Sequence, residues 1–329
     1  MKVAVVGAGV MGLAGAWRLT QRGADVTVYE QFEVGHANGS SHGRSRIFRL
    51  AYGEPEWVEL AREAYDGWRE LEAESGERLL ELRGLLEVVT DLEESSAATL
   101  DACGVDWERL DGAEAERRFP VRVPPPSFAV LQPQAGIVRA DRALTVLAKL
   151  VDVRENTRIE SIGDLDADVV VVTAGSWVNQ LVEPPLDVKV TRETVCYFRL
   201  DDPRPVPALV SFKPEEHLHD MYSLADPVHG LKVGAHHAGV KVEPGGTGEP
   251  DGALVERITD WARRSWLLAD PDPVAAETCL YTTTPDQRFV LERRGRVVVG
   301  SACSGHGFKF APVVGQRLAD LVDCTPEPD

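Results

Sequence analysis

The sequence is poor in the features of exported, membrane-spanning and zinc-binding proteins. Its cysteines are odd in number, widely spaced and free of C-x-x-C pairs: Cys103, Cys196, Cys279, Cys303 and Cys324. This pattern disfavours a disulfide framework and a zinc site, and it predicts a reducing compartment, the cytoplasm. No apolar run approaches the roughly 20 residues of a membrane-spanning helix. The start "MKVAVVGAGVMG", with a lone Lys2 and several glycines, argues against a signal peptide.

Positive charge is also scarce. Lysine and arginine together number 35, against 53 aspartates and glutamates, and the formal net charge is −18. A protein that binds nucleic acid or anionic lipid needs a cationic surface, so neither is an expected partner. At 329 residues, 43% hydrophobic and 27% charged, the chain is typical of one large or two interleaved folded domains. Any local cluster of cations is therefore informative.

The N-terminus carries a dinucleotide-binding pattern. The apolar run "KVAVV" leads into "GAGVMG", which places Gly7, Gly9 and Gly12 in G-x-G-x-x-G spacing before a predicted helix. Gly7 permits a tight turn, Gly9 lets a pyrophosphate approach the helix N-terminus, and Gly12 lets the helix pack close to the strand. A second predicted strand, "DVTVYE", ends in Glu30, 21 residues after Gly9, where an acid binds a ribose diol. The pattern does not choose between NAD and FAD.

The rest of the chain does not repeat a βαβ rhythm. A long loop is expected over residues 31–53, followed by an amphipathic helix at 56–76 and strands near 84 and 194. Further α/β segments begin at "DADVVVV" and "RVVVGSAC". The expected fold class is α/β with an α+β insert: a Rossmann-type domain assembled from discontinuous segments, and an antiparallel-sheet substrate domain. Such interleaving favours a flavoprotein.

Two local patterns place cations among apolar residues. In "HGRSRIFR", His42, Arg44, Arg46 and Arg49 fall within eight positions and are interrupted by apolar residues, so some must border a buried region and need anionic partners. A solvated basic face is the alternative reading. The stretch "SGHGFKF" places Lys309 between two phenylalanines, where the alternative is a lysine that reaches solvent.

The chain resembles the monomeric sarcosine oxidase and N-methyltryptophan oxidase family, within the FAD-dependent D-amino acid oxidase-like enzymes. The resemblance covers nearly the whole chain through "GAGVMG", "HANGSSHGRSRIFRLAYG", "AGSW", "GLKVGAHH", "TCLYTTTPDQRFVLE" and "SGHGFKF". It implies an FAD-binding domain of residues 1–80, 137–185 and 280–329. It also implies a substrate domain of residues 81–136 and 186–279.

The resemblance also assigns residues to the substrate side of the site. Arg49 and Lys309 match the pair that holds a substrate carboxylate, and Lys232 matches a lysine over the flavin that promotes reaction with oxygen. The other matches that border the substrate are His236, Tyr222 and Tyr281. Because Lys232 and His236 are four residues apart in a strand-like segment, they are expected on the same side.

On the cofactor side, Cys279 matches a cysteine that forms a thioether to the flavin 8α-methyl carbon. That link needs thiolate character, which His42 and Arg46 are expected to promote. A small buried hydrophobic residue is the alternative for Cys279. The cofactor-binding matches comprise Gly7, Gly9, Gly12, Glu30, Ser41, His42, Arg46, Gly175, Cys279, Gly305, Gly307 and Phe308.

The resemblance implies an oxidase of a secondary (N-alkyl) amino acid that forms an imine and reduces molecular oxygen to hydrogen peroxide, and a monomer. A cyclic imino acid, glycine or an N-carboxymethyl amine is an alternative substrate. A flavin dehydrogenase with a protein electron acceptor and a non-catalytic dinucleotide-binding protein are alternative functions. No metal is expected, because the cluster His217, His219, His236 and His237 lacks a completing ligand pattern.

Overall fold

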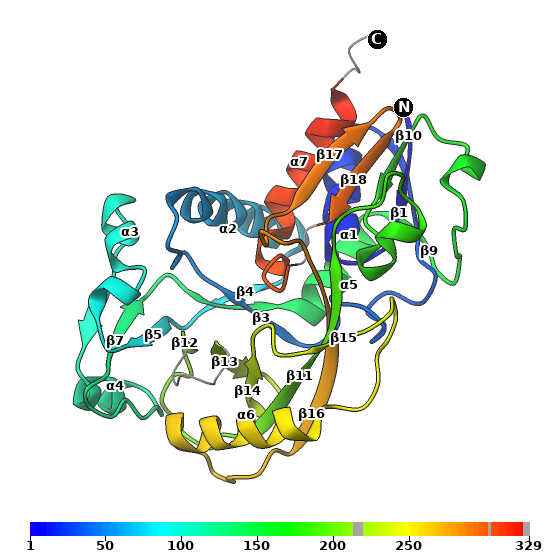
Figure 1. Ribbon diagram of the computed structural model, residues 1–329. Coiled ribbons are helices and arrows are strands. Elements are labelled where there is room, and N and C mark those ends of the chain that lie inside the picture. Colours follow the sequence, from blue (N-terminus) through cyan, green and yellow to red (C-terminus); the bar gives the residue numbers. More distant parts are fainter. Residues whose placement is uncertain (213–219, 302–303, 325–329) are drawn as a thin grey trace.

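A six-stranded sheet forms the upper part of the molecule in Figure 1. The structure is a computed structural model that describes residues 1–212, 220–301 and 304–324. The strands, in spatial order, are β17 (Val290–Arg294), β18 (Val297–Ser301), β10 (Val169–Val172), β1 (Lys2–Val6), β2 (Asp25–Tyr29) and β9 (Asp152–Arg154). All neighbours are parallel except β17 and β18. The all-valine β10 is fully buried, as expected of a strand covered on both faces.

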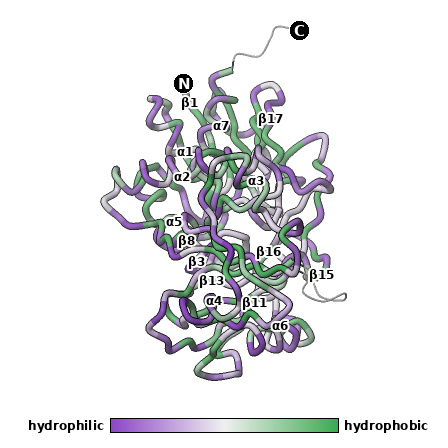
Figure 2. The backbone as a smooth tube through the Cα atoms, turned by 90° about the vertical axis from the view of Figure 1, so that its left-hand side faces the viewer, coloured by the Kyte–Doolittle hydropathy of each residue, from purple (hydrophilic) through white to green (hydrophobic). Residues whose placement is uncertain are grey.

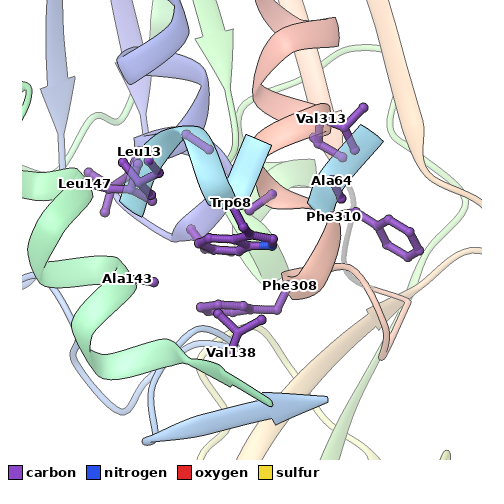
Figure 3. Close-up of a cluster of buried hydrophobic side chains, with 14 of the residues drawn as sticks. Leu13, Ala64, Trp68, Val138, Ala143, Leu147, Phe308, Phe310 and Val313 are labelled. Carbon is purple, nitrogen blue, oxygen red and sulfur yellow. The ribbon is translucent and has the colours of Figure 1, made fainter. Parts of the chain in front are cut away.

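Helices from distant parts of the chain pack together beside this sheet. They are α1 (Val10–Gln21), α2 (Pro55–Ser75), α5 (Ala140–Lys149) and α7 (Ala311–Asp323). Figure 3 shows Leu13 of α1, Trp68 of α2, Leu147 of α5 and Val313 of α7 in one apolar cluster. At Gly315 a Cβ would lie 2.5 Å from the Ala14 carbonyl oxygen, so a glycine is needed for α7 to approach α1 this closely.

A nine-stranded, largely antiparallel sheet forms the second part. Its order is β15 (Val240–Lys241), β11 (Lys189–Arg199), β14 (Gly230–Ala235), β13 (Met221–Asp226), β12 (Ala208–Ser211), β5 (Leu85–Val89), β7 (Phe128–Gln132) and β6 (Glu108–Leu110), and β16 (Ala275–Thr283) pairs with β11. The β12–β5 pair is parallel. Helix α6 (Gly252–Ser265) covers one face through Leu254, Ile258 and Trp261. Figure 2 shows α6 at the opposite end of the molecule from α1 and β1, with hydrophilic residues frequent in the outer loops.

A third sheet has three short strands, in the spatial order β3 (Ser45–Phe48), β8 (Gly136–Arg139) and β4 (Leu80–Leu82). The remaining elements are α3 (Ala97–Ala102), α4 (Gly112–Arg118), η1 (Leu92–Glu94), η2 (Ile162–Asp164), η3 (Gly175–Gln180) and η4 (Phe308–Phe310). Strand β3 corrects the expectation of a long loop at 31–53, because Arg46 and Ile47 pair with Val138 and Ile137 of β8, 92 and 90 residues away.

The predicted fold class is confirmed: a parallel dinucleotide-type sheet accompanies a largely antiparallel sheet. The division into two domains stays a prediction, and its boundary at 279/280 falls inside β16, all of which pairs with β11. In the described part of the chain, no helix is both long and apolar enough to cross a membrane.

Candidate active site

A cavity of about 400 Å³ extends from the glycine turn after β1 to the face of the antiparallel sheet. Its walls include Gly7 and Glu30 at one end and Arg49, Lys232 and Lys309 at the other. Ligand pockets of roughly 300–1,000 Å³ are typical of small-molecule and cofactor sites. The carboxyl ends of parallel strands, where β1 and β2 terminate, are the usual binding edge of such sheets.

The glycine turn is shaped by its own packing. Gly7 has φ +104°, and a Cβ there would lie 2.6 Å from the Thr173 carbonyl oxygen. A Cβ on Gly12 would lie 2.0 Å from the Gly7 carbonyl oxygen, whereas one on Gly9 would meet only Ser41 Oγ, at 3.3 Å. Gly7 and Gly12 thus allow the turn and the close helix packing. Gly9, at the N-terminus of α1, and Ser41 both line the cavity. The Ser41 hydroxyl accepts a hydrogen bond from Val10 N at 3.1 Å.

Glu30 lies directly after β2 and is buried. Its Oε2 accepts a hydrogen bond from Ala8 N at 2.8 Å, and its Oε1 accepts one from Phe32 N at 3.0 Å. His36 Nε2 lies 3.4 Å from Oε1. Burial opposes ionisation, but the His36 and backbone hydrogen bonds outweigh it and lower the pKa of Glu30. The carboxylate is therefore ionised beside the glycine turn.

The strand register places the other candidate residues on one face of the nine-stranded sheet. Directly opposite residues of an antiparallel pair share a face, and so do alternate residues along a strand. Lys232 of β14 lies opposite Leu224 of β13 on one side and opposite Tyr197 of β11 on the other. Tyr197 in turn lies opposite Ala275 of β16. By alternation Cys279 and Tyr281 share this face and line the cavity. The other face carries Phe198 and Leu231 toward α6.

Arg49 and Lys309 form a cationic end of the cavity without a carboxylate partner. Arg49 Nη1 is buried and has no hydrogen-bond partner among residues 1–212, 220–301 and 304–324, and its guanidinium lies 4.6 Å from the Tyr52 ring centroid. Lys309 is 6% exposed, and its Nζ donates to the His306 carbonyl oxygen at 2.8 Å. Burial and the Arg49 charge lower the pKa of Lys309 well below its usual value. Within the described residues neither cation forms an ion pair, so the site favours an incoming anion.

Lys232 lies with Arg46 near the turn at Gly43. A Cβ on Gly43 would lie 3.3 Å from Arg46 Nη1 and 3.9 Å from Lys232 Nζ. Burial and the Arg46 charge lower the pKa of Lys232 to about 8, although anionic neighbours oppose them. Lys232 is therefore a buried, titratable cation in the cavity wall.

Cys279 is 8% exposed and lines the cavity, but its electrostatic surroundings differ from the expectation. Burial and the Arg46 charge lower the pKa of His42 to about 4, so at neutral pH this imidazole adds no positive charge. Its ring nitrogens face the Gly39 and Thr278 carbonyl oxygens. Of the two residues expected to promote a thiolate, Arg46 is therefore the one that carries charge at neutral pH, and the buried Glu193 lies directly opposite Cys279 on β11.

Tyr222, Tyr281 and His236 pack against two glycines. A Cβ on Gly234 would lie 2.6 Å from Tyr222 Oη, and one on Gly305 would lie 2.5 Å from Tyr281 Cε2. His236 Nδ1 lies 3.4 Å from Tyr281 Oη. Burial raises the pKa of both tyrosines and lowers that of His236. All three side chains are neutral at neutral pH and form an uncharged wall beside the cations.

The structure brings most of the predicted residues to this cavity. Besides those described, Gly175, Gly305, Gly307 and Phe308 line it, whereas Gly12 and His42 do not. His217 and His219 lie outside the described residues. In the part of the chain that the structure describes, no group of three or more His, Cys, Asp or Glu side chains is placed to hold a metal.

Sequence reasoning missed several lining residues. His36 and Trp177 lie toward the Glu30 end, and Phe212, Asp220 and His306 toward the cationic end. His306 lies inside "SGHGFKF", so that motif contained a signal. His36 begins the motif "HANGSSHGRSRIFRLAYG" and Trp177 ends "AGSW", so these motifs contained a signal too. Phe212 and Asp220 lie outside the quoted motifs and reach the cavity through tertiary placement.

Comparisons with known proteins agree with this arrangement. The family described as FAD dependent oxidoreductase matches residues 2–321. Peroxisomal sarcosine oxidase of Mus musculus is 33% identical, over 96% of this chain and 90% of its own. N-methyl-L-tryptophan oxidase of Yersinia pestis (strain Pestoides F) is 30% identical, over 98% of this chain and 95% of its own. The structure of NikD, an unusual amino acid oxidase essential for nikkomycin biosynthesis, has a TM-score of 0.87 at 28% identity and covers 99% of this chain and 95% of its own.

Proposed function

Because the chain belongs to the FAD dependent oxidoreductase family, we propose that it is an FAD-dependent oxidase of a secondary (N-alkyl) amino acid. It converts the C–N bond to an imine and reduces O2 to hydrogen peroxide. The 33% and 30% identical relatives, a sarcosine oxidase and an N-methyl-L-tryptophan oxidase, support this substrate class.

The residues present fit FAD. Gly9 lines the cavity at the N-terminus of α1, where the backbone N–H groups and the helix dipole suit a pyrophosphate. Glu30 is ionised beside that turn, where it is suited to accept hydrogen bonds from a ribose diol. The cavity continues from there to Arg46, Cys279 and Phe308. Residues of this set would hold the cofactor along the length of the cavity.

The observation that carries the substrate proposal is the pair Arg49 and Lys309. Two cations without an ion-pair partner in the described residues line one end of a cavity whose nearby His236, Tyr222 and Tyr281 are uncharged. A guanidinium fork binds a carboxylate through two hydrogen bonds, and an ammonium adds a charge from another direction. Burial and the Arg49 charge lower the pKa of Lys309, and binding of an anion beside it would favour its charged form.

When bound, FAD would supply the redox chemistry, as the acceptor of two electrons and one proton, formally a hydride, from the carbon next to the substrate nitrogen. The chain's own residues do the rest. Arg49 and Lys309 fix the carboxylate and so orient the amine. The neutral wall of Tyr222, Tyr281 and His236 limits water at the reacting carbon. Lys232 stabilises the negative charge that develops on oxygen as O2 takes up two electrons and two protons. The imine product is hydrolysed by water.

We also propose that Cys279 holds the cofactor covalently. Its position in the cavity wall and the nearby Arg46 charge support this, while Glu193 opposes thiolate formation. The cytoplasmic location and the monomeric state stay predictions from the sequence. The mouse relative is, by its name, peroxisomal.

Two measurements test the proposal. Purified protein is assayed for hydrogen peroxide with sarcosine, an N-methylated aromatic amino acid, a cyclic imino acid and glycine. Peroxide at one mole per mole of imine product, with a preference for secondary amines, is expected. Substrate-dependent flavin reduction with little peroxide would indicate a dehydrogenase. A preference for glycine or the cyclic imino acid would show that the proposed substrate class, secondary amino acids, is wrong.

The cofactor link is tested by acid precipitation. Yellow colour that stays in the pellet of the wild type, and moves to the supernatant for Cys279→Ala, is expected. The buried Cys196 provides the matched control: because it belongs to the α6-side core, Cys196→Ala keeps the colour in the pellet. A white wild-type pellet under a yellow supernatant would remove the covalent link and keep the flavoprotein.

A further inference from the structure

Lys232 shares its sheet face with two carboxylates, Asp226 and Glu277. Tyr197 of β11 and Leu224 of β13 lie directly opposite Lys232. Asp226 is two positions after Leu224 and is therefore a diagonal neighbour of Lys232. Glu277 is two positions after Ala275, the partner of Tyr197, so it is a diagonal neighbour of Tyr197 and lies two strands away from Lys232.

Asp226 is already compensated. Its side chain is fully buried, and its Oδ2 lies 3.1 Å from Arg44 Nε. Its Oδ1 accepts hydrogen bonds from Val228 N at 3.0 Å and His229 N at 2.8 Å. Because Arg44 offsets this carboxylate at close range, Asp226 contributes little net negative charge to Lys232.

Glu277 is different. Its Oε2 accepts a hydrogen bond from Tyr197 Oη at 2.7 Å, and no ion pair involves Glu277 within residues 1–212, 220–301 and 304–324. The Tyr197 ring centroid lies 5.9 Å from Lys232 Nζ and 5.2 Å from Arg44 Cζ. Tyr197 thus fixes the Glu277 carboxylate through its hydroxyl group while its ring contacts both cations.

The remaining charged groups around Lys232 come from residues 42–46 and from β16. Among the residues that the structure describes, the Arg46 guanidinium donates to three backbone carbonyl oxygens, those of Ser40, His42 and Ser45. The imidazole of His42 is neutral at neutral pH. Burial and Arg46 lower the pKa of Lys232, whereas Cys279, Glu277 and Asp226 raise it. Without an ion-paired cation of its own, Glu277 is the fixed carboxylate best able to oppose Arg46.

We propose that Glu277, held by the Tyr197 hydroxyl, is a positioning residue that supplies the counter-charge keeping Lys232 protonated during the reaction with oxygen. The proposal rests on the proposed oxidase function and on the proposed role of Lys232 in it. Glu277 acts through Lys232 and does not touch the substrate. Its loss therefore affects the oxygen step at a pH where Lys232 titrates, and leaves flavin reduction by substrate unchanged.

The test is stopped-flow reoxidation of the photochemically reduced holoenzyme over pH 6–10, alongside anaerobic reduction by substrate. In the wild type the oxygen rate falls with rising pH as Lys232 loses its proton. In Glu277→Gln the midpoint of this pH-dependent decrease in the rate is expected about one pH unit lower than in the wild type. At a pH above the midpoints of both proteins, the variant therefore reacts with oxygen about tenfold more slowly than the wild type. Glu277→Asp retains the charge and restores most of the wild-type profile. Glu292→Gln, at an ion pair on β17, serves as the matched control and leaves the profile unchanged.

Lys232→Met separates the inference from the function on which it rests. If Lys232→Met slows reoxidation but Glu277→Gln keeps the wild-type pH profile, the counter-charge role is wrong and the oxidase proposal stands. If Glu277→Gln slows both half-reactions equally at every pH, Glu277 is merely structural and the inference is also wrong. If Lys232→Met leaves reoxidation unchanged, the role of Lys232 fails and the inference fails with it.

Discussion

Replacing Arg49 by glutamine tests the carboxylate site most directly. In the described part of the chain, Arg49 Nη1 is buried without a hydrogen-bond partner, so its desolvation is unfavourable in the ligand-free protein. A hydrogen bond to a charged group contributes about 1.5–3 kcal/mol. Loss of the paired contact to a substrate carboxylate, at about 3 kcal/mol, corresponds to roughly a 150-fold weaker affinity. Folding stability is expected to stay level or rise, because a partly buried charge without an ion pair in the described residues is removed.

The assay compares a substrate with its uncharged amide. Dissociation constants for both are measured from the change in flavin absorbance under anaerobic conditions, with thermal unfolding in parallel. The wild type is expected to prefer the carboxylate by about two orders of magnitude, and Arg49→Gln to lose most of that preference. Arg288→Gln, at surface ion pairs with Glu54 and Glu56, is the matched control. An Arg49→Gln protein that still prefers the carboxylate as strongly as the wild type would refute the reasoning.

Two further predictions concern stability. In Gly67→Ala the new Cβ would lie 2.5 Å from Pro312 Cβ, so the protein is expected to be less stable: overpacking costs about 1–3 kcal/mol, more than the gain of roughly 1 kcal/mol in helix propensity. Urea unfolding measures this change, and Gly252→Ala, whose new Cβ would have no atom within 4 Å, is the neutral control. The pKa of Glu30 is lower in the folded protein than its unfolded value of about 4.5. The ionised carboxylate therefore stabilises the fold at any pH above about 4.5, and this stabilisation is lost as the pH falls through the folded pKa. The difference in unfolding free energy between wild type and Glu30→Gln should therefore shrink below about pH 4.5, and a difference independent of pH would contradict this assignment.

Much of the cofactor end could be predicted from the sequence because its determinants are local. Gly7, Gly9 and Gly12 lie within one turn, and Glu30 ends the next strand, so spacing alone specifies their arrangement. The amphipathic helix predicted at 56–76 is confirmed as α2, with Ala64 and Trp68 buried. These features depend on neighbours within a few residues, where sequence patterns are informative.

The electrostatics around Cys279, Lys232 and His42 could not be predicted, because they depend on pairing between distant strands. The Glu193–Cys279 and Tyr197–Lys232 pairs join residues 86 and 35 positions apart in the chain, and no local pattern specifies such a register. The neutral state of His42 likewise follows from burial and from Arg46. The residue types at the site were readable from the sequence, whereas their charges required the tertiary neighbours.

The order of strands in the parallel sheet has a consequence for biosynthesis. Strand β1 pairs with β10, and β10 pairs with β18, whose residues 297–301 lie near the end of the described chain. A ribosome-bound chain cannot complete this sheet, or pack α7 against α1, until those late residues have emerged. Loop closure over such separations slows folding. The cofactor is therefore expected to associate after translation, and a nascent chain stalled before β18 should remain a chaperone substrate that added FAD does not rescue.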